Sequence, residues 1–167
     1  MMEHVLKGLL PSGRTLPDRA PSLARRLSDV VGNPLGVDVS ELPEVDKYVV
    51  SLYQQKGYEA FDDLQKPEFF EPLFAFIGEA IIKATGGEWR MSQSKEFDVW
   101  EPWVVRRTGD HFAGYELARI CRLFKCPDPG SFSIADEVDF MLRVPDKLPL
   151  DRFADDRKTQ KGQASFD

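Results

Sequence analysis

The clearest periodic pattern in the chain is an apolar stripe that begins at Val45 and ends at Tyr53. Its members recur at intervals of three and four residues, which places them on one face of an α-helix (Val45, Tyr48, Val49, Leu52 and Tyr53). Pro43 suits the first turn of that helix, and Gly57 ends it. The same spacing predicts an earlier helix over 18–31.

The segment 68–85 is apolar on nearly all sides of a helix rather than along one stripe. A helix of that kind is stable when it is buried, so we expect it at the centre of the fold. Pro72 removes a backbone hydrogen bond inside the segment, so the helix either kinks at this residue or begins there. Gly86 and Gly87 end the helix.

After Gly87 the pattern changes from helical spacing to alternation. Three short segments rich in aromatic and β-branched residues predict two or three strands (88–92, 97–100 and 103–106). Pro102 cannot donate a backbone hydrogen bond, so it marks an edge, a bulge or a break in the sheet. Residues 108–110 are typical of a turn.

Two further helices are predicted after this sheet, the first over about 113–125. The second begins at Ser133, whose spacing to Asp136 resembles a capping box, and it ends near Arg143. We expect residues 146–167 to form an extended or mobile tail, with three apolar side chains available to dock it on the body (Leu148, Leu150 and Phe153).

This order of elements predicts one α+β domain over 17–145. Helices lie at both ends of the domain around a small antiparallel sheet at about 88–107. Residues 1–16 are mixed and turn-rich, so we expect a loose N-terminal arm.

The composition of the chain argues against a nucleic-acid-binding protein and against a membrane protein. The chain has 167 residues and a net charge of −6, and such an acidic domain repels nucleic-acid phosphates. No apolar run reaches the length of a membrane span, and no signal peptide is visible before Pro11 and Gly13. We therefore expect a soluble cytoplasmic protein whose partners include neither nucleic acid nor membrane.

No sequence motif identifies an enzyme. The chain lacks a phosphate-binding glycine loop, a nucleophile elbow and the spacings that hold zinc, so we expect neither a cofactor nor a metal. Its two cysteines, Cys121 and Cys126, lie on opposite sides of one predicted helix, which disfavours a disulfide. Cys121 is typical of a small core residue.

Three residues form a possible ligand site at the junction of the central helix and the first strand (Glu79, Trp89 and His111). A carboxylate in an apolar helix can titrate near neutral pH and act as an acid or base. The alternative is structural, because Lys83 follows Glu79 by four residues in the favourable order. Gly78 beside Glu79 indicates close packing of another element.

A second set of residues indicates a partner-binding surface in the strand region (Trp100, Trp103, Glu101, Asp98 and Asp110). Exposed tryptophans are frequent anchors at the centres of interfaces. Strict alternation puts Trp100 and Trp103 on opposite faces of the sheet, so we expect one of them outside the core. The alternative is that both belong to a core between sheet and helix. Arg106 and Arg107 are either an anion-binding spot or a solvated face.

Residues 36–90 contain three short motifs: Gly36-Val37-Asp38-Val39-Ser40, Phe76-Ile77-Gly78-Glu79-Ala80 and Gly86-Gly87-Glu88-Trp89. This arrangement resembles a group of small bacterial proteins of unknown function, some of which belong with toxin-immunity or contact-dependent systems. The resemblance implies a helix-to-strand junction at 86–89. It implies no catalytic residues.

The leading hypothesis is a non-catalytic domain that binds another protein, because an acidic surface suits a basic partner. Neutralisation of a toxin, as in an immunity protein, is one concrete form of it. The first alternative is a small-ligand-binding protein or enzyme in which Glu79, Asp98 and His111 converge. The second is a self-associating structural protein that pairs through a strand edge near Pro102.

Overall fold

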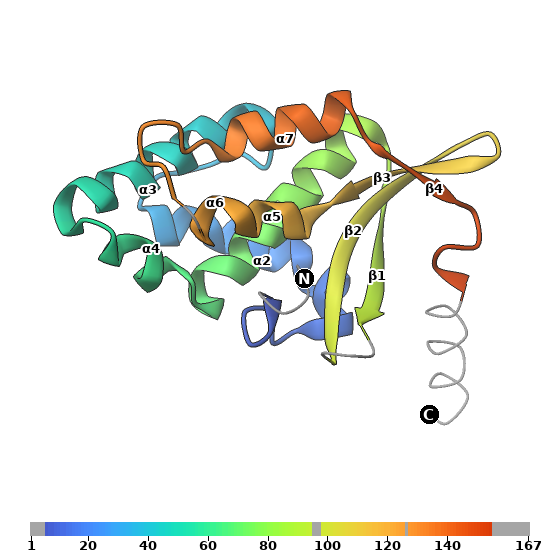
Figure 1. The fold of residues 1–167 in the computed structure, drawn as a ribbon, viewed down its shortest axis with the longest axis horizontal. Helices are drawn as coiled ribbons and strands as arrows, with labels where there is room; N and C mark the ends of the chain where they lie inside the picture. Colours follow the sequence, from blue (N-terminus) through green and yellow to red (C-terminus); the bar gives the residue numbers. More distant parts are fainter. Residues whose placement is uncertain (1–5, 95–97, 126, 155–167) are drawn as a thin grey trace.

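The fold is α+β, as the sequence predicts: a layer of helices covers one face of a four-stranded antiparallel sheet (Figure 1). The computed structural model describes residues 6–94, 98–125 and 127–154. Its α-helices and strands are α2 (Leu16–Val31), α3 (Leu42–Lys56), α4 (Glu59–Leu64), α5 (Pro67–Thr85), β1 (Glu88–Ser94), β2 (Val99–Thr108), β3 (His111–Glu116), α6 (Cys121–Lys125), α7 (Ile134–Arg143) and β4 (Asp146–Pro149). Short 3-10 helices are η1 (Gly13–Thr15), η2 (Val39–Glu41) and η3 (Leu117–Ile120).

Helix α5 lies at the centre of the fold and packs along α2 (Figure 1). It is buried on almost every side from Phe69 to Ile81, which confirms the prediction from its apolar composition. The helix begins at Pro67 and continues through Pro72, so the second proline is interior. Gly86 ends α5 in the left-handed conformation, with φ of 73°.

The sheet has the strand order β1-β2-β3-β4 with every pair antiparallel, and it is larger than the sequence predicts. Residues 113–116 belong to β3, not to the predicted helix over 113–125. The reason is burial of both faces of β3, where Phe112, Ala113 and Tyr115 are all covered. A strand buried on both faces loses its alternation and has the same pattern as a buried helix.

The C-terminal tail completes the sheet. Residues Asp146–Pro149 pair with β3 as strand β4, and Phe153 is only 1% exposed. Phe153 and Leu148 pack with Trp103, Val105 and Phe112 into a second apolar cluster on the sheet face that the helices leave free. Docking of this segment is therefore confirmed for 146–154, whereas 155–167 lie outside the described residues.

The predicted loose arm at 1–16 is wrong for the part that the structure describes. Leu6, Leu9 and Leu10 are buried in the main core. The backbone N–H of Ser12 donates to a side-chain oxygen of Glu71 in α5 at 2.7 Å. Three closely spaced leucines bury enough apolar area to order the segment, so the domain includes residues N-terminal to 17.

Candidate functional site

The junction between α5 and β1 is held by Glu79 and Trp89. The indole Nε1 of Trp89 donates to Oε1 of Glu79 at 2.9 Å, and both side chains are half-buried. Gly78 makes this contact possible: a Cβ at that position would lie 1.9 Å from Cη2 of Trp89. The predicted close packing at Gly78 is confirmed. The Glu79 carboxylate acts as an acceptor in a helix-to-strand contact.

The predicted pairing of Glu79 with Lys83 is wrong. The Lys83 ammonium pairs instead with Asp38 at 3.1 Å. Asp38 also accepts a hydrogen bond from the backbone N–H of Ser40, and this bond, with the Ser40 side chain and Lys83, lowers the Asp38 pKa to about 2. Lys83 therefore connects α5 to the loop before η2.

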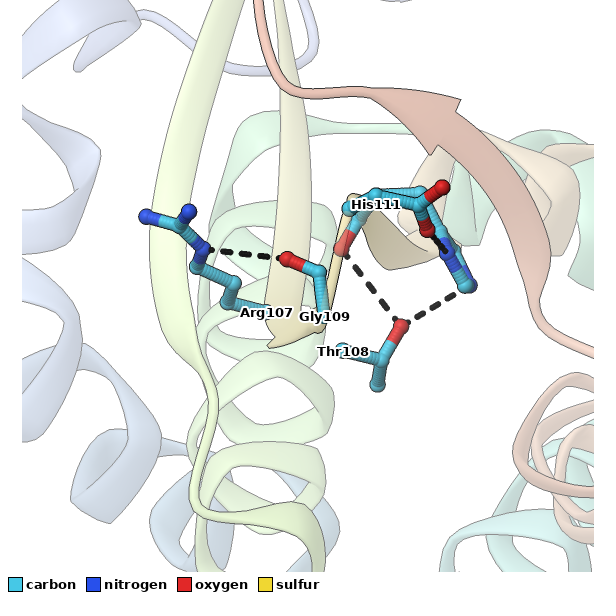
Figure 2. A network of polar contacts seen from close by, with 5 residues as sticks. Arg107, Thr108, Gly109 and His111 are labelled. Carbon is cyan, nitrogen blue, oxygen red and sulfur yellow. Dashed lines mark hydrogen bonds and ion pairs between the residues drawn. The ribbon is translucent and has the colours of Figure 1, made fainter.

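Figure 2 shows that His111 lies in a polar network at the turn between β2 and β3. Its Nδ1 contacts Oδ1 of Asp110 at 3.0 Å, and its Nε2 contacts Oγ1 of Thr108 at 2.8 Å. The hydrogen bond with His111 lowers the pKa of Asp110. These atom pairs match those of a nucleophile–base–acid triad. However, the Asp110 side chain is 93% exposed, so water is not excluded, and the network stabilises the turn.

The ligand-site residues that the sequence predicts do not converge. Asp98 precedes β2, whereas His111 pairs with Thr108 at the far end of that ten-residue strand. The two are separated by about 30 Å at about 3.3 Å per residue. Trp89 pairs with Val104, about 13 Å along the strand from Thr108 by the same rise. The structure unites Glu79 with Trp89 and leaves His111 apart, so an acid–base site of Glu79, Asp98 and His111 is excluded.

The residues of the predicted partner-binding surface also do not lie together. Trp100 and Trp103 belong to different apolar clusters, so they point to opposite faces as predicted. Trp100 is half-buried against the main core, whereas Trp103 and Glu101 are buried. Trp103 is covered by the C-terminal segment, which sequence reasoning did not place there. Both tryptophans therefore pack in the fold and do not form one exposed platform.

The remaining two members, Asp98 and Asp110, are both exposed but lie at opposite ends of β2. Asp98 has a positive φ of 51° and accepts a hydrogen bond from Gln93 at 3.3 Å. The two carboxylates therefore lie apart and form no continuous surface.

Strand β1, not the region of Pro102, forms the long edge of the sheet. Pro102 lies in β2 between two neighbours, one residue beyond the end of the β2–β3 pairing, which begins at Trp103. The missing N–H of Pro102 therefore interrupts neither the β1–β2 pairing nor the β2–β3 pairing. Strand β2 continues from Val99 to Thr108. Sequence reasoning missed the β1 edge because strand order is a property of the tertiary structure.

The two edges of the sheet differ in how they are protected. Strand β4 has four residues, including the exposed Lys147 and Pro149. Short length, lysine and proline are the usual devices that prevent an edge from pairing. Strand β1 has seven residues, no lysine and no proline. Among the described residues, β2 is the only strand that pairs with β1.

Three surface hollows lie away from all the predicted site residues that the structure describes. The largest, about 650 Å³, follows the end of α2 and is lined by Arg25, Ser28, Asp29, Gly32, Asn33, Pro34 and Leu35. A hollow of about 360 Å³ lies between α4 and α6 beside the exposed Tyr58. Another of about 360 Å³ lies between α2 and α5. Their linings mix exposed charges with apolar side chains in no arrangement that indicates a reaction.

Cys121 is a core residue, as predicted. Burial raises the pKa of its thiol to about 12, so the reactive thiolate is not populated near neutral pH. Cys126 lies outside the described residues. Within 6–94, 98–125 and 127–154, no three His, Cys, Asp or Glu side chains gather closely enough to hold a metal ion.

The helices in the described part of the chain include none with the length and apolarity of a membrane span. No protein-family model, curated protein or solved structure matches the chain. The resemblance to small bacterial proteins over 36–90 therefore stays a prediction.

Proposed function

We propose that this chain is a non-catalytic protein-binding domain that takes an extended segment of a partner protein on the edge of β1. The observation that carries the proposal is the contrast between the two edges of the sheet. The β4 edge is blunted by its length, Lys147 and Pro149, whereas β1 has none of these features over seven residues. An edge strand without these protective features is a template for an added strand.

The side chains of β1 suit such pairing. Met91 is anchored in the core, and the indole of Trp89 is fixed by Glu79, so the strand is rigid before a partner arrives. A rigid strand loses little conformational entropy on binding. Arg90 and Glu88 pair with each other at 2.7 Å, which leaves no single-sign charge along the edge to repel a partner.

The net charge of −6 favours a basic partner, because complementary charge accelerates encounter. Backbone hydrogen bonds to β1 then supply the lasting contacts. Neutralisation of a basic toxin, or regulation of another basic protein, is the form of this function that we propose. Raising the salt concentration is expected to slow association more than it speeds dissociation.

Placing a lysine on the β1 edge is expected to weaken partner binding at least tenfold. Gln93→Lys adds to β1 the device that protects β4, since a lysine must be desolvated when another strand pairs beside it. The matched control is Gln54→Lys on the exposed side of α3, which makes the same charge change away from the sheet. The partner is captured from source-cell lysate, identified, purified and titrated against wild-type protein and both variants.

Amide hydrogen exchange of the complex provides a test that needs no substitution. Residues 88–92 are expected to gain protection at the N–H groups that point away from β2, because those groups become bonded to the added strand. Equal binding by both variants, protection confined to another surface or failure to capture a partner would refute the proposal. A concentration-dependent dimer that protects β1 without a partner would replace it with self-association.

A further inference from the structure

Two buried N–H donors on the outer face of the sheet lack an acceptor among the described residues: Nε of Arg90 and Nε1 of Trp103. Arg90 and Trp103 are direct partners in the β1–β2 register, so their side chains lie next to each other on one face. Trp103 is 6% exposed. A buried donor without an acceptor destabilises the fold, which makes two at one position a notable feature.

The six-membered ring of Trp103 lies toward β3. A Cβ on Gly114 of β3 would lie 3.2 Å from Cζ3 of Trp103, so the six-membered ring lies over β3. Cζ3 and Nε1 are at opposite ends of an indole. The Nε1 end therefore lies on the side of the ring away from Gly114, and Arg90 is the neighbour of Trp103 on β1.

Arg152 covers the same place from the C-terminal segment. Its guanidinium carbon is 5.8 Å from the Trp103 ring centroid, and its Nη1 donates to Oγ of Ser92 at 3.2 Å. Arg152 thus reaches from β2 to the residue of β1 that is two positions beyond Arg90. Three donor side chains, two of them cationic, surround one cross-strand position.

The neighbouring acids do not supply the missing acceptor. Glu88 binds Nη2 of Arg90 at 2.7 Å, while Nη1 of Arg90 donates to the carbonyl of Trp89 at 3.0 Å. Glu101 and Glu116 share this face, and each has an interaction of its own. Three carboxylates and two guanidinium groups share this face, so a multiply charged anion such as phosphate is disfavoured more strongly than a monoanion.

We infer that this cluster is a binding site for a small carboxylate, independent of the proposed β1-edge function. The carboxylate oxygens accept from Nε–H of Arg90 and Nε1–H of Trp103, and Arg152 closes the site with a second positive charge. A carboxylate is the acceptor that matches such donors, because charge-assisted hydrogen bonds are stronger than neutral ones. The source is a free small acid or the terminus of a peptide.

Indole N–H signals in two-dimensional NMR of the full chain test this site. The chain has three tryptophans, and Trp89, whose N–H is held by Glu79, is an internal control. Titration with sodium acetate, against sodium chloride at equal ionic strength, is expected to shift the Trp103 signal saturably. Trp103→Phe assigns that signal. Parallel titrations with N-acetylglycine and its amide distinguish a peptide terminus from a free acid.

Arg90→Lys keeps the charge and removes Nε–H, so acetate affinity is expected to fall at least tenfold. The matched control is Arg107→Lys, because Arg107 Nε donates to Gly109 at the turn, away from this cluster. Its acetate affinity is expected to be unchanged. The inference would be overturned if neither carboxylate shifted the Trp103 signal, or if sodium chloride shifted it equally. Water would then be the acceptor for the two donors. Equal acetate affinity in Arg90→Lys and Arg107→Lys would also overturn the inference.

Discussion

Gly78→Ala is expected to lower the free energy of unfolding by about 3 kcal/mol. The new methyl group would lie 1.9 Å from Cη2 of Trp89, so the indole must move away from α5. Overpacking costs about 1–3 kcal/mol, and loss of the charge-assisted bond to Glu79 adds about 1.5–3. The helix propensity of alanine returns about 1 kcal/mol. Urea unfolding followed by tryptophan fluorescence measures the difference.

A double-mutant cycle identifies the cause of that loss. In a Trp89→Leu background the side chain that collides with the new methyl group is gone, so Gly78→Ala is expected to cost less than about 1 kcal/mol. An equal cost in both backgrounds would show that the indole is not responsible. A Gly78→Ala protein as stable as the wild type would contradict the packing described at the α5–β1 junction.

Asp46→Ala is expected to destabilise the fold by about 3 kcal/mol, because α3 supplies the N-terminal cap of α7 through this residue. Its carboxylate accepts from the backbone N–H of Ile134 at 2.6 Å, from that of Ala135 at 3.1 Å and from Oγ of Ser133 at 3.3 Å. Alanine leaves these donors without their acceptor. Asp46→Asn retains one oxygen and is expected to lose about half as much, as urea unfolding would measure.

The pH dependence of Asp46 has a definite sign. Burial raises the Asp46 pKa above its usual 3.8, although the three donors act in the opposite direction. The folded protein then holds this proton more tightly than the unfolded chain. The resulting stabilisation is full below pH 3.8 and is lost as pH rises through the folded pKa. The stability advantage of wild type over Asp46→Asn is therefore expected to shrink as pH rises from about 3.5. A stability difference between wild type and Asp46→Asn that stays constant or grows with pH would contradict a raised Asp46 pKa.

Several local features were accessible from sequence because each depends on nearest neighbours along the chain. The burial of α5 followed from its composition, and its end at Gly86 from the conformation of glycine. Ser133 accepts from the backbone N–H of Asp136 at 3.0 Å, as the capping pattern predicts. The sequence predicts close packing at Gly78, but it does not predict that the indole of Trp89 is the group packed there.

The candidate sites depend on contacts between segments far apart in the chain. Asp46 caps a helix that begins 88 residues later, and nothing in the spacing of either segment indicates it. The sequence predicts that Trp103 belongs to a partner-binding surface, but Phe153 and Arg152 of the C-terminal segment cover its ring. Residues that the sequence placed in one site, such as Asp98 and His111, lie at opposite ends of β2.

The sequence by itself determined the α+β class, the central helix, the turn at 108–110 and the opposite orientations of Trp100 and Trp103. These follow from periodicity, backbone preference and strand alternation, which act within a few residues. Only the tertiary structure decided that β1 and β4 are the two outer strands of the described sheet and that Arg90, Trp103 and Arg152 gather on one face. Strand order and segment docking depend on which distant apolar surfaces bury each other, and local patterns do not encode that choice.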